Sequence, residues 1–230
     1  MIEGEARSVI SRPKAILLDW DNTLVDNSES IHEAMTATLL GMGHAPWPLA
    51  ETQRRARRSL RESFPEIFGD QWERAREIFH QRFAADHLNG LKTSPGAEDM
   101  LAGLAARGIY LAVVSNKTGS YLRREAAHLG WDRYFGAIVG ATDAEADKPA
   151  VAPVDLALAK SGVVRGRSVW FVGDGAVDMD CAHRAGCVAV LLRGQPPGEH
   201  EFAPNPPDRH VTSCADLAAF VDALTPVAAP

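Results

Sequence analysis

The fold is most clearly indicated by one stretch of the sequence, Lys14-Ala15-Ile16-Leu17-Leu18-Asp19-Trp20-Asp21-Asn22-Thr23. It opens with a short apolar run and ends abruptly in acidic and amide side chains. A continuous apolar run of this length is typical of a parallel strand that is buried on both faces. If the chain stays extended past Leu18, Asp19 and Asp21 point to one side and Trp20 to the other. The stretch therefore predicts a central strand with two carboxylates at its carboxyl end.

Helical patterns without a clear strand fill the chain from about residue 26 to residue 90. Asp26 and Glu29 can form a capping box for a helix that reaches about residue 40. Two further helices are predicted at residues 49–62 and 70–88. This block interrupts the strand pattern and predicts a small all-helical cap domain over residues 26–90.

Beyond residue 90 the sequence alternates between helical patterns and short apolar strands. The predicted strands are residues 109–114, 136–139, 169–172 and 188–192, with a short one near Val211. Strand–helix alternation predicts a parallel sheet with helices on both faces. We therefore expect an α/β protein whose Rossmann-like core domain is formed by residues 1–25 and 91–230, with the cap inserted.

Composition limits the partners that this protein can take. Its 230 residues are 46% hydrophobic and 23% charged, which is ordinary for a globular protein with a sizeable core. A net charge of −6 disfavours nucleic acid and anionic membranes as partners. The N-terminus contains acids and has no apolar core segment, so no signal peptide is predicted, and no apolar run approaches the roughly 20 residues of a membrane helix. We expect a cytoplasmic protein, either a monomer or a homodimer.

The cysteines are too few and too scattered for a disulfide framework or a zinc cluster. They are Cys181, Cys187 and Cys214. They are most simply small core or surface residues.

Three further segments place polar side chains where ligands gather, beyond the carboxyl ends of parallel strands. Ser115-Asn116-Lys117 can donate hydrogen bonds to phosphate oxygens. Lys148-Pro149 supplies a flexible positive charge. Gly173-Asp174 follows a strand, and Asp178 lies about one helical turn beyond Asp174 on the same face. Taken singly, each segment has a plain explanation as a polar turn, a helix cap or a solvated lysine.

Taken together, these side chains predict one site that binds both a metal ion and a phosphate group. The acids provide the hard oxygen ligands that suit Mg²⁺: Asp19, Asp21, Asp174 and Asp178. Mg²⁺ and Lys148 would supply the local positive charge that an acidic protein needs to hold a phosphorylated substrate. A carboxylate beside the phosphorus atom can then attack it and form an aspartyl-phosphate.

The order and spacing of the four motifs resemble the haloacid dehalogenase superfamily, from Lys14 to Leu224. The stretch from Leu18 to Asp26 is similar to the first motif of the family. The other three are matched by Ser115-Asn116, by Lys148-Pro149, and by Gly173-Asp174 with Asp178. Within the superfamily, the chain is most similar to the phosphoglycolate phosphatase-like group. One motif is weak evidence, but four in order are specific.

The resemblance implies a Mg²⁺-dependent phosphatase with Asp19 as the nucleophile. Asp21 would protonate the leaving oxygen and then activate water against the aspartyl-phosphate. The ion would be held by the Asp19 carboxylate, the Asp21 backbone carbonyl and Asp174, with Asp178 in support, directly or through water. The phosphate would be held by Ser115, Asn116 and Lys148. Because Trp20 lies between the two acids, its backbone amide is also expected to contact the phosphate. The substrate would be a small phosphorylated metabolite under the cap, and 2-phosphoglycolate is a candidate by resemblance only.

The chain departs from the family pattern at three positions, none of which removes a catalytic group. Asn22 stands where the family usually has glycine, and asparagine tolerates unusual backbone angles better than most residues. Asn27 replaces a common serine. Gly175 stands where serine or threonine is frequent.

A cluster of arginines in the predicted cap has two interpretations. Arg54, Arg58 and Arg61 share a helix face. One of them could reach a substrate carboxylate, but a solvated face is favoured.

Three other functions compete with phosphate ester hydrolysis. A phosphomutase would need the same core residues and differ in its cap. A dehalogenase is disfavoured, because the dehalogenases of the family lack the second aspartate, here Asp21, and need no metal. A non-catalytic phosphate-accepting or phosphate-binding protein is disfavoured by the helical insertion and by Asp21.

Overall fold

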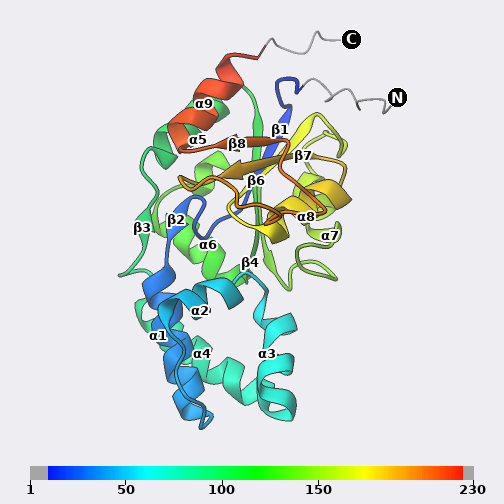
Figure 1. Ribbon diagram of the computed structural model, residues 1–230. Coiled ribbons are helices and arrows are strands. Elements are labelled where there is room, and N and C mark those ends of the chain that lie inside the picture. The colour runs from blue at the N-terminus through cyan, green and yellow to red at the C-terminus, as the bar shows by residue number, and fades with distance from the viewer. Residues whose placement is uncertain (1–9, 225–230) are drawn as a thin grey trace, which may run out of the picture.

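The computed structural model describes residues 10–224, which form a six-stranded sheet with inserted helices beside it (Figure 1). Each strand in this sheet pairs in parallel with its neighbours. In sheet order the strands are β5 (Ala137–Ala141), β4 (Tyr110–Thr118), β1 (Ala15–Leu18), β6 (Val169–Gly173), β7 (Val188–Leu192) and β8 (Arg209–Val211). The predicted parallel sheet is confirmed, with the opening stretch at its centre.

Helices cover both faces of the sheet. On one face lie α5 (Ala97–Ala106), α6 (Gly119–His128) and α9 (Cys214–Asp222). On the other lie α7 (Ala152–Leu158) and α8 (Ala176–Arg184). Ile16 and Leu18 pack in the first layer and Ala15 and Leu17 in the second, all of them fully buried. This explains why the strand is apolar at every position.

The register of the central strands brings three chain segments to one edge of the sheet. Leu18 pairs with Val113 of β4 and with Val172 of β6. Because parallel strands end on the same side, the residues that follow these three positions converge there.

The chain between residues 26 and 92 forms a separate group of helices: α1 (Ser28–Gly41), α2 (Leu49–Arg55), α3 (Leu60–Phe68) and α4 (Trp72–Asp86). They bury their own apolar cluster, whose largest members are Met35, Leu39, Phe64, Phe68, Phe79 and Phe83. The two chain crossings pair as a short antiparallel ladder of β2 (Val25–Asp26) and β3 (Lys92–Thr93). The arrangement fits the expected cap, whose limits at 26–90 stay a prediction. Residues 1–9 and 225–230, assigned to the core domain, lie outside the described residues.

Two of the differences from the predicted elements affect the site. The helix expected over residues 49–62 is divided into α2 and α3, and the loop between them contacts the core: the Arg57 carbonyl accepts a hydrogen bond from Asn116 Nδ2 at 3.1 Å. Strand β4 continues to Thr118, although its apolar run ends at Val114. Among residues 10–224, no helix is both long and apolar enough to cross a membrane.

Candidate active site

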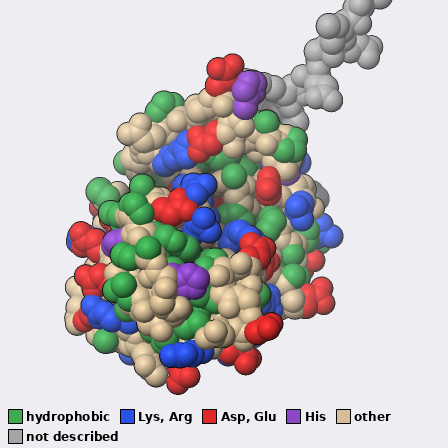
Figure 2. Space-filling view, turned by 60° about the horizontal axis from the view of Figure 1, so that its bottom comes forward, with side chains coloured by type: hydrophobic (Ala, Val, Ile, Leu, Met, Phe, Trp, Pro, Cys, Tyr) green, Lys and Arg blue, Asp and Glu red, His purple; other side chains and the backbone are tan. Residues whose placement is uncertain are grey.

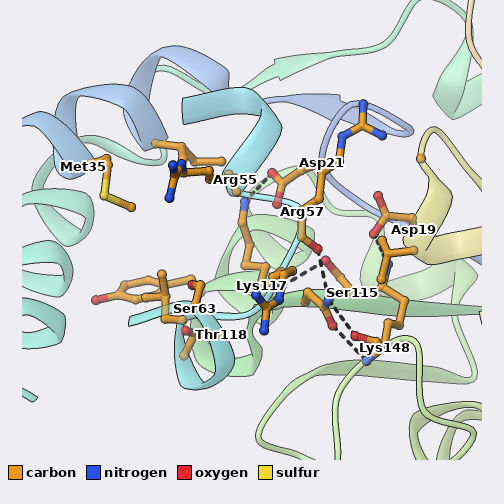
Figure 3. A pocket seen from close by; sticks show the side chains of 18 of the residues that line it. Asp19, Asp21, Met35, Arg55, Arg57, Ser63, Ser115, Lys117, Thr118 and Lys148 are labelled. Atoms are coloured by element: carbon orange, nitrogen blue, oxygen red, sulfur yellow. Dashed lines mark hydrogen bonds and ion pairs between the residues drawn. The ribbon is translucent and has the colours of Figure 1, made fainter. Parts of the chain in front are cut away.

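A pocket lies between the carboxyl edge of the sheet and the inserted helices (Figure 3). From the core it is lined by Asp19, Asp21, Ser115, Asn116, Lys117, Lys148, Asp174 and Asp178. From the inserted block it is lined by residues that include Ile31, Met35, Arg57, Phe79 and Phe83. Its cavity volume is about 90 Å³, whereas one water needs roughly 10–15 Å³. The structure thus gathers every predicted site side chain except that of Trp20 around a space for a small molecule.

Asp19 continues β1 by one residue. Its backbone amide donates to the Val172 carbonyl at 2.8 Å, which fixes the carboxylate at the edge of the sheet. Its side chain is almost buried. Lys148 Nζ donates to Oδ1 at 2.5 Å, and Thr23 Oγ1 donates to Oδ2 at 3.4 Å.

A tight turn follows Asp19 and directs Asp21 into the same pocket. Asn22 has a φ of 63°, in the left-handed region, and its amide donates to the Val25 carbonyl at 2.7 Å. The expectation that asparagine can replace glycine here is confirmed. The Trp20 side chain points away and packs edge-on against Trp131, with ring centroids 5.9 Å apart. A phosphate contact from the Trp20 amide stays a prediction.

Lys148 is the central cation of the site. Its Nζ bridges Asp19 Oδ1 at 2.5 Å and Asp178 Oδ1 at 2.8 Å, and only 2% of the residue is exposed. Burial by itself would lower the pKa of this lysine, but the two carboxylates outweigh it and raise the pKa above its ordinary value. The ammonium is therefore charged at neutral pH.

Three acids meet around this lysine. One oxygen from each of Asp19, Asp174 and Asp178 can be chosen so that all lie within 4.8 Å of one another. Burial and the charges of Asp178 and Asp19 raise the pKa of Asp174 to about 7, against the opposing effect of Arg57 and Lys148. The pKa of Asp178 is also raised, mainly by burial.

The pKa values of Asp174 and Asp178 are raised, and a bound cation would relieve the repulsion among the clustered carboxylates. The donors are all hard oxygens, and they face a cavity that can hold water molecules. The residues present therefore fit a hard divalent cation such as Mg²⁺.

Asp21 belongs to a second charged group in the same pocket. Lys117 Nζ donates to Asp21 Oδ1 at 2.7 Å and to Glu125 Oε2 at 2.6 Å, and Glu125 is fully buried on α6. Burial raises the pKa of Asp21 to about 6, with Lys117 opposing and Glu125 adding to the rise. A carboxyl group that can gain and lose a proton near neutral pH suits general acid–base work.

Ser115 and Asn116 make mainly backbone contacts in this structure. Ser115 Oγ accepts from the Lys117 amide at 3.2 Å. Asn116 Nδ2 donates to the carbonyls of Arg57 and Lys148, both at 3.1 Å, and Asn116 Oδ1 accepts from the Lys148 amide at 3.0 Å. Asn116 thus positions the loop that carries Lys148, and its predicted phosphate contact stays a prediction.

The inserted helices contribute one arginine to the acid cluster. Arg57 Nη2 lies 3.4 Å from Asp174 Oδ2. A Cβ atom added at Gly175 would lie only 2.3 Å from Arg57 Nη1. The missing side chain at Gly175, one of the departures from the family pattern, therefore makes room for this guanidinium.

The arginine face predicted to be solvated is divided between two environments. Arg54 and Arg58 are exposed and pair with Glu51 and Glu66 within the inserted block. Basic and acidic side chains accordingly lie side by side on the face that this block presents (Figure 2). Arg61 instead pairs with the buried Asp147 of the core at 2.7 Å, because the break between α2 and α3 turns it inward.

Several residues of the site carry no clear signal in the sequence. Glu125 is a single acid in an amphipathic helix, and His87 follows the last inserted helix, so neither stands in a motif. The sequence marks Lys117 only as a possible phosphate donor. The available signal for Arg57 is the concentration of arginines between residues 54 and 61.

Fold and site together define an α/β enzyme with an acid cluster at the carboxyl edge of its sheet, covered by inserted helices. Residues 16–192 match the family described as haloacid dehalogenase-like hydrolase. The chain belongs to this family, and the resemblance inferred from its four motifs is confirmed.

Individual relatives agree with this assignment. The chain is 28% identical to a phosphoglycolate phosphatase from Photorhabdus laumondii over 225 residues, with 94% of this chain and 95% of the relative covered. It is 28% identical to a 5'-nucleotidase from Pseudomonas aeruginosa, with 95% and 98% covered. A crystal structure of a haloacid dehalogenase superfamily hydrolase from Ehrlichia chaffeensis superposes with a TM-score of 0.64 at 25% identity, covering 94% of this chain and 99% of that one.

Proposed function

We propose that this hydrolase is a Mg²⁺-dependent phosphatase that cleaves a small phosphate monoester through an aspartyl-phosphate on Asp19. The observation that carries the proposal is the contact of Lys148 with both Asp19 and Asp178, beside Asp174 and under a small pocket. In this arrangement Asp19 would be the nucleophile, Lys148 would bind phosphate oxygens, and the carboxylates would supply hard oxygen ligands for the metal. The relatives named as phosphatases support the same reaction class.

The proposed reaction has two steps, transfer of the phosphoryl group to Asp19 and its hydrolysis. In the first, an Asp19 oxygen forms a bond to phosphorus, the bond from phosphorus to the ester oxygen breaks, and Asp21 gives its proton to that oxygen. In the second, Asp21 takes a proton from water, whose oxygen attacks phosphorus and releases Asp19 and inorganic phosphate. Lys148 and Ser115 would hold the phosphate oxygens throughout.

The metal would be held by the Asp19 carboxylate, the Asp21 carbonyl and Asp174, with Asp178 in support. When bound, it neutralises the negative charge shared by the acids and the phosphate oxygens. The pairing of Asp178 Oδ2 with the Gly175 amide at 3.1 Å keeps that carboxylate turned toward the site.

The substrate would be small, because the cavity is small and the inserted helices close over it. 2-Phosphoglycolate is a candidate, supported by the names of several relatives. A nucleoside monophosphate is a second test compound because of the 5'-nucleotidase relative.

The test is phosphate release from a panel of phosphorylated metabolites, with Mg²⁺ or with EDTA. Wild type is compared with Asp19→Asn and with Asp132→Asn, which makes the same change at an exposed position. We expect release that needs Mg²⁺, is lost in Asp19→Asn and is retained in Asp132→Asn. Release that persists in EDTA would contradict the metal requirement. Transfer of phosphate between positions of a sugar phosphate, without release, would favour a phosphomutase.

A further inference from the structure

A buried carboxylate behind the pocket accepts four hydrogen bonds. Glu125 is fully buried. Its Oε1 accepts from Asn27 Nδ2 at 3.0 Å and from His87 Nδ1 at 2.9 Å. Its Oε2 accepts from Trp20 Nε1 at 2.7 Å and from Lys117 Nζ at 2.6 Å. Four donors fill the ordinary capacity of a carboxylate, and each of these comes from a different element or loop.

The two oxygens of Glu125 bind different parts of the molecule. The donors on Oε1 lie at the two ends of the inserted block, since Asn27 immediately precedes α1 and His87 immediately follows α4. The donors on Oε2 belong to the core, where Lys117 is part of β4 and Trp20 follows β1. One side chain thus joins both crossings of the chain to the strand ends that carry the site.

The contact with Lys117 continues to the proposed general acid. Lys117 Nζ also donates to Asp21 Oδ1 at 2.7 Å, and only 5% of its side chain is exposed. The ammonium is therefore fixed between two carboxylates, as Figure 3 shows for its contact with Asp21. Because Lys117 contacts Oδ1, Oδ2 of Asp21 is the oxygen that would carry the proton in the proposed reaction.

The polar donors at the crossings are not explained by packing. Asn27 Oδ1 and His87 Nε2 are buried with no hydrogen-bond partner among the residues that the structure describes. A buried polar atom without a partner destabilises a fold, so apolar side chains would fill these positions at lower cost. The contact that each makes with Glu125 is the feature that requires a polar side chain here.

We propose that Glu125 is a positioning residue that holds the Lys117 ammonium against Asp21 while its other oxygen is seated on Asn27 and His87. This inference rests on the proposed function, in which Asp21 protonates the leaving oxygen. It makes the orientation of the general acid depend on the placement of the inserted helices. A displacement of Asn27 or His87 would then move the Glu125 carboxylate, and with it Lys117 and Asp21.

The test compares two esters that differ in their need for a proton. An alkyl phosphate needs protonation of its leaving oxygen, whereas 2,4-dinitrophenyl phosphate releases a stable anion without it. Rapid-quench single turnovers would measure phosphoryl transfer to the protein in Glu125→Gln and Lys117→Met, with Mg²⁺ present. We expect transfer from the alkyl ester to fall about 100-fold in both variants, the lower range for general acid catalysis, and transfer from the dinitrophenyl ester to change about threefold or less.

The control and a milder variant keep the test decisive. Arg123→Gln removes an exposed ion pair between α6 and Asp143, and we expect both esters to react as in wild type. Asn27→Ala leaves the contact between Glu125 and Lys117 in place and removes one donor on Oε1. We expect a selective loss of about three- to tenfold for the alkyl ester, between no effect and the full general-acid contribution. This variant decides the question if Glu125→Gln melts at a much lower temperature.

The outcomes separate this inference from the proposed function. Equal losses for both esters in Glu125→Gln and Asn27→Ala would overturn the inference and leave Glu125 a structural residue. Wild-type protein that reacts with neither ester would instead refute the proposed function. A selective loss for the alkyl ester, absent in Arg123→Gln, would establish the positioning role.

Discussion

Replacing Lys148 by methionine should expose the charge balance on which the site depends. The substitution keeps most of the side-chain volume and removes the ammonium that contacts both Asp19 and Asp178. Breaking a buried ion pair by removing one partner destabilises proteins by about 3–5 kcal/mol. The acids that stay behind lie within 4.8 Å of one another and become harder to accommodate without a cation.

The expected effect is large enough for a simple thermal melt. For a chain of this size, 1 kcal/mol lowers the midpoint by about 2–4 °C, so Lys148→Met in EDTA should melt roughly 6–20 °C below wild type. Mg²⁺ should raise the midpoint of the variant more than that of wild type, because the ion then relieves more repulsion. The same variant should lose about 100-fold or more in kcat, as other buried phosphate- or oxyanion-binding groups do when they are removed.

Lys160→Met is the matched control, since Lys160 is exposed. Surface substitutions of this kind change stability by about 0.5 kcal/mol or less. If Lys148→Met melts within about 2 °C of wild type in EDTA, the reasoning about a charge-balancing lysine is refuted. Equal midpoint shifts on adding Mg²⁺ to both proteins would refute the link between this lysine and the metal site.

Three further changes test other parts of the site. Asp21→Asn should slow both chemical steps and let aspartyl-phosphate accumulate in rapid-quench samples; normal turnover would remove its acid–base role. Gly175→Ser should displace the Arg57 guanidinium, whose partly exposed ion pair with Asp174 is worth about 1 kcal/mol or less. KM should therefore rise up to about fivefold. An unchanged KM would show that Arg57 does not help to close the site. The hydrogen bonds from Arg193 hold the pKa of Glu201 down to about 2, below its ordinary 4.5, so this ion pair stabilises the fold above pH 4.5 and its contribution is lost as the pH falls toward 2. Glu201→Gln should therefore lower the free energy of unfolding by about 1 kcal/mol or less near neutral pH and leave it unchanged near pH 2. An equal effect at both pH values would contradict this.

The features of the fold that could be predicted are those encoded locally. The apolar run ending at Leu18 is a buried parallel strand, and the helices and strands after residue 90 alternate as their patterns indicate. The convergence of Asp19, Lys148 and Asp174 followed from the rule that parallel strands end at one edge. Each of the four motifs is predicted to lie at or near that edge, so the differences in element boundaries leave the predicted position of the site unchanged.

The features that could not be predicted depend on contacts between distant parts of the chain. The break between α2 and α3 coincides with a hydrogen bond from Asn116 to the Arg57 carbonyl, which no local pattern announces. Arg61 shares a sequence pattern with exposed arginines, yet its partner is the buried Asp147. Three of the four donors to Glu125 lie 38 or more residues away in the chain, so no local pattern marks this residue.

A phosphoryl group on Asp19 would be direct evidence that this residue is the nucleophile. Asp21→Asn protein would be mixed with Mg²⁺ and the preferred ester, quenched in acid and digested for peptide mass spectrometry. We expect a phosphoryl group on Asp19 that appears within one turnover and is absent when the same protein also carries Asp19→Asn. Two results together would contradict this role for Asp19: no phosphoryl group on Asp19 of the Asp21→Asn protein, and turnover of the ester by both wild type and Asp19→Asn.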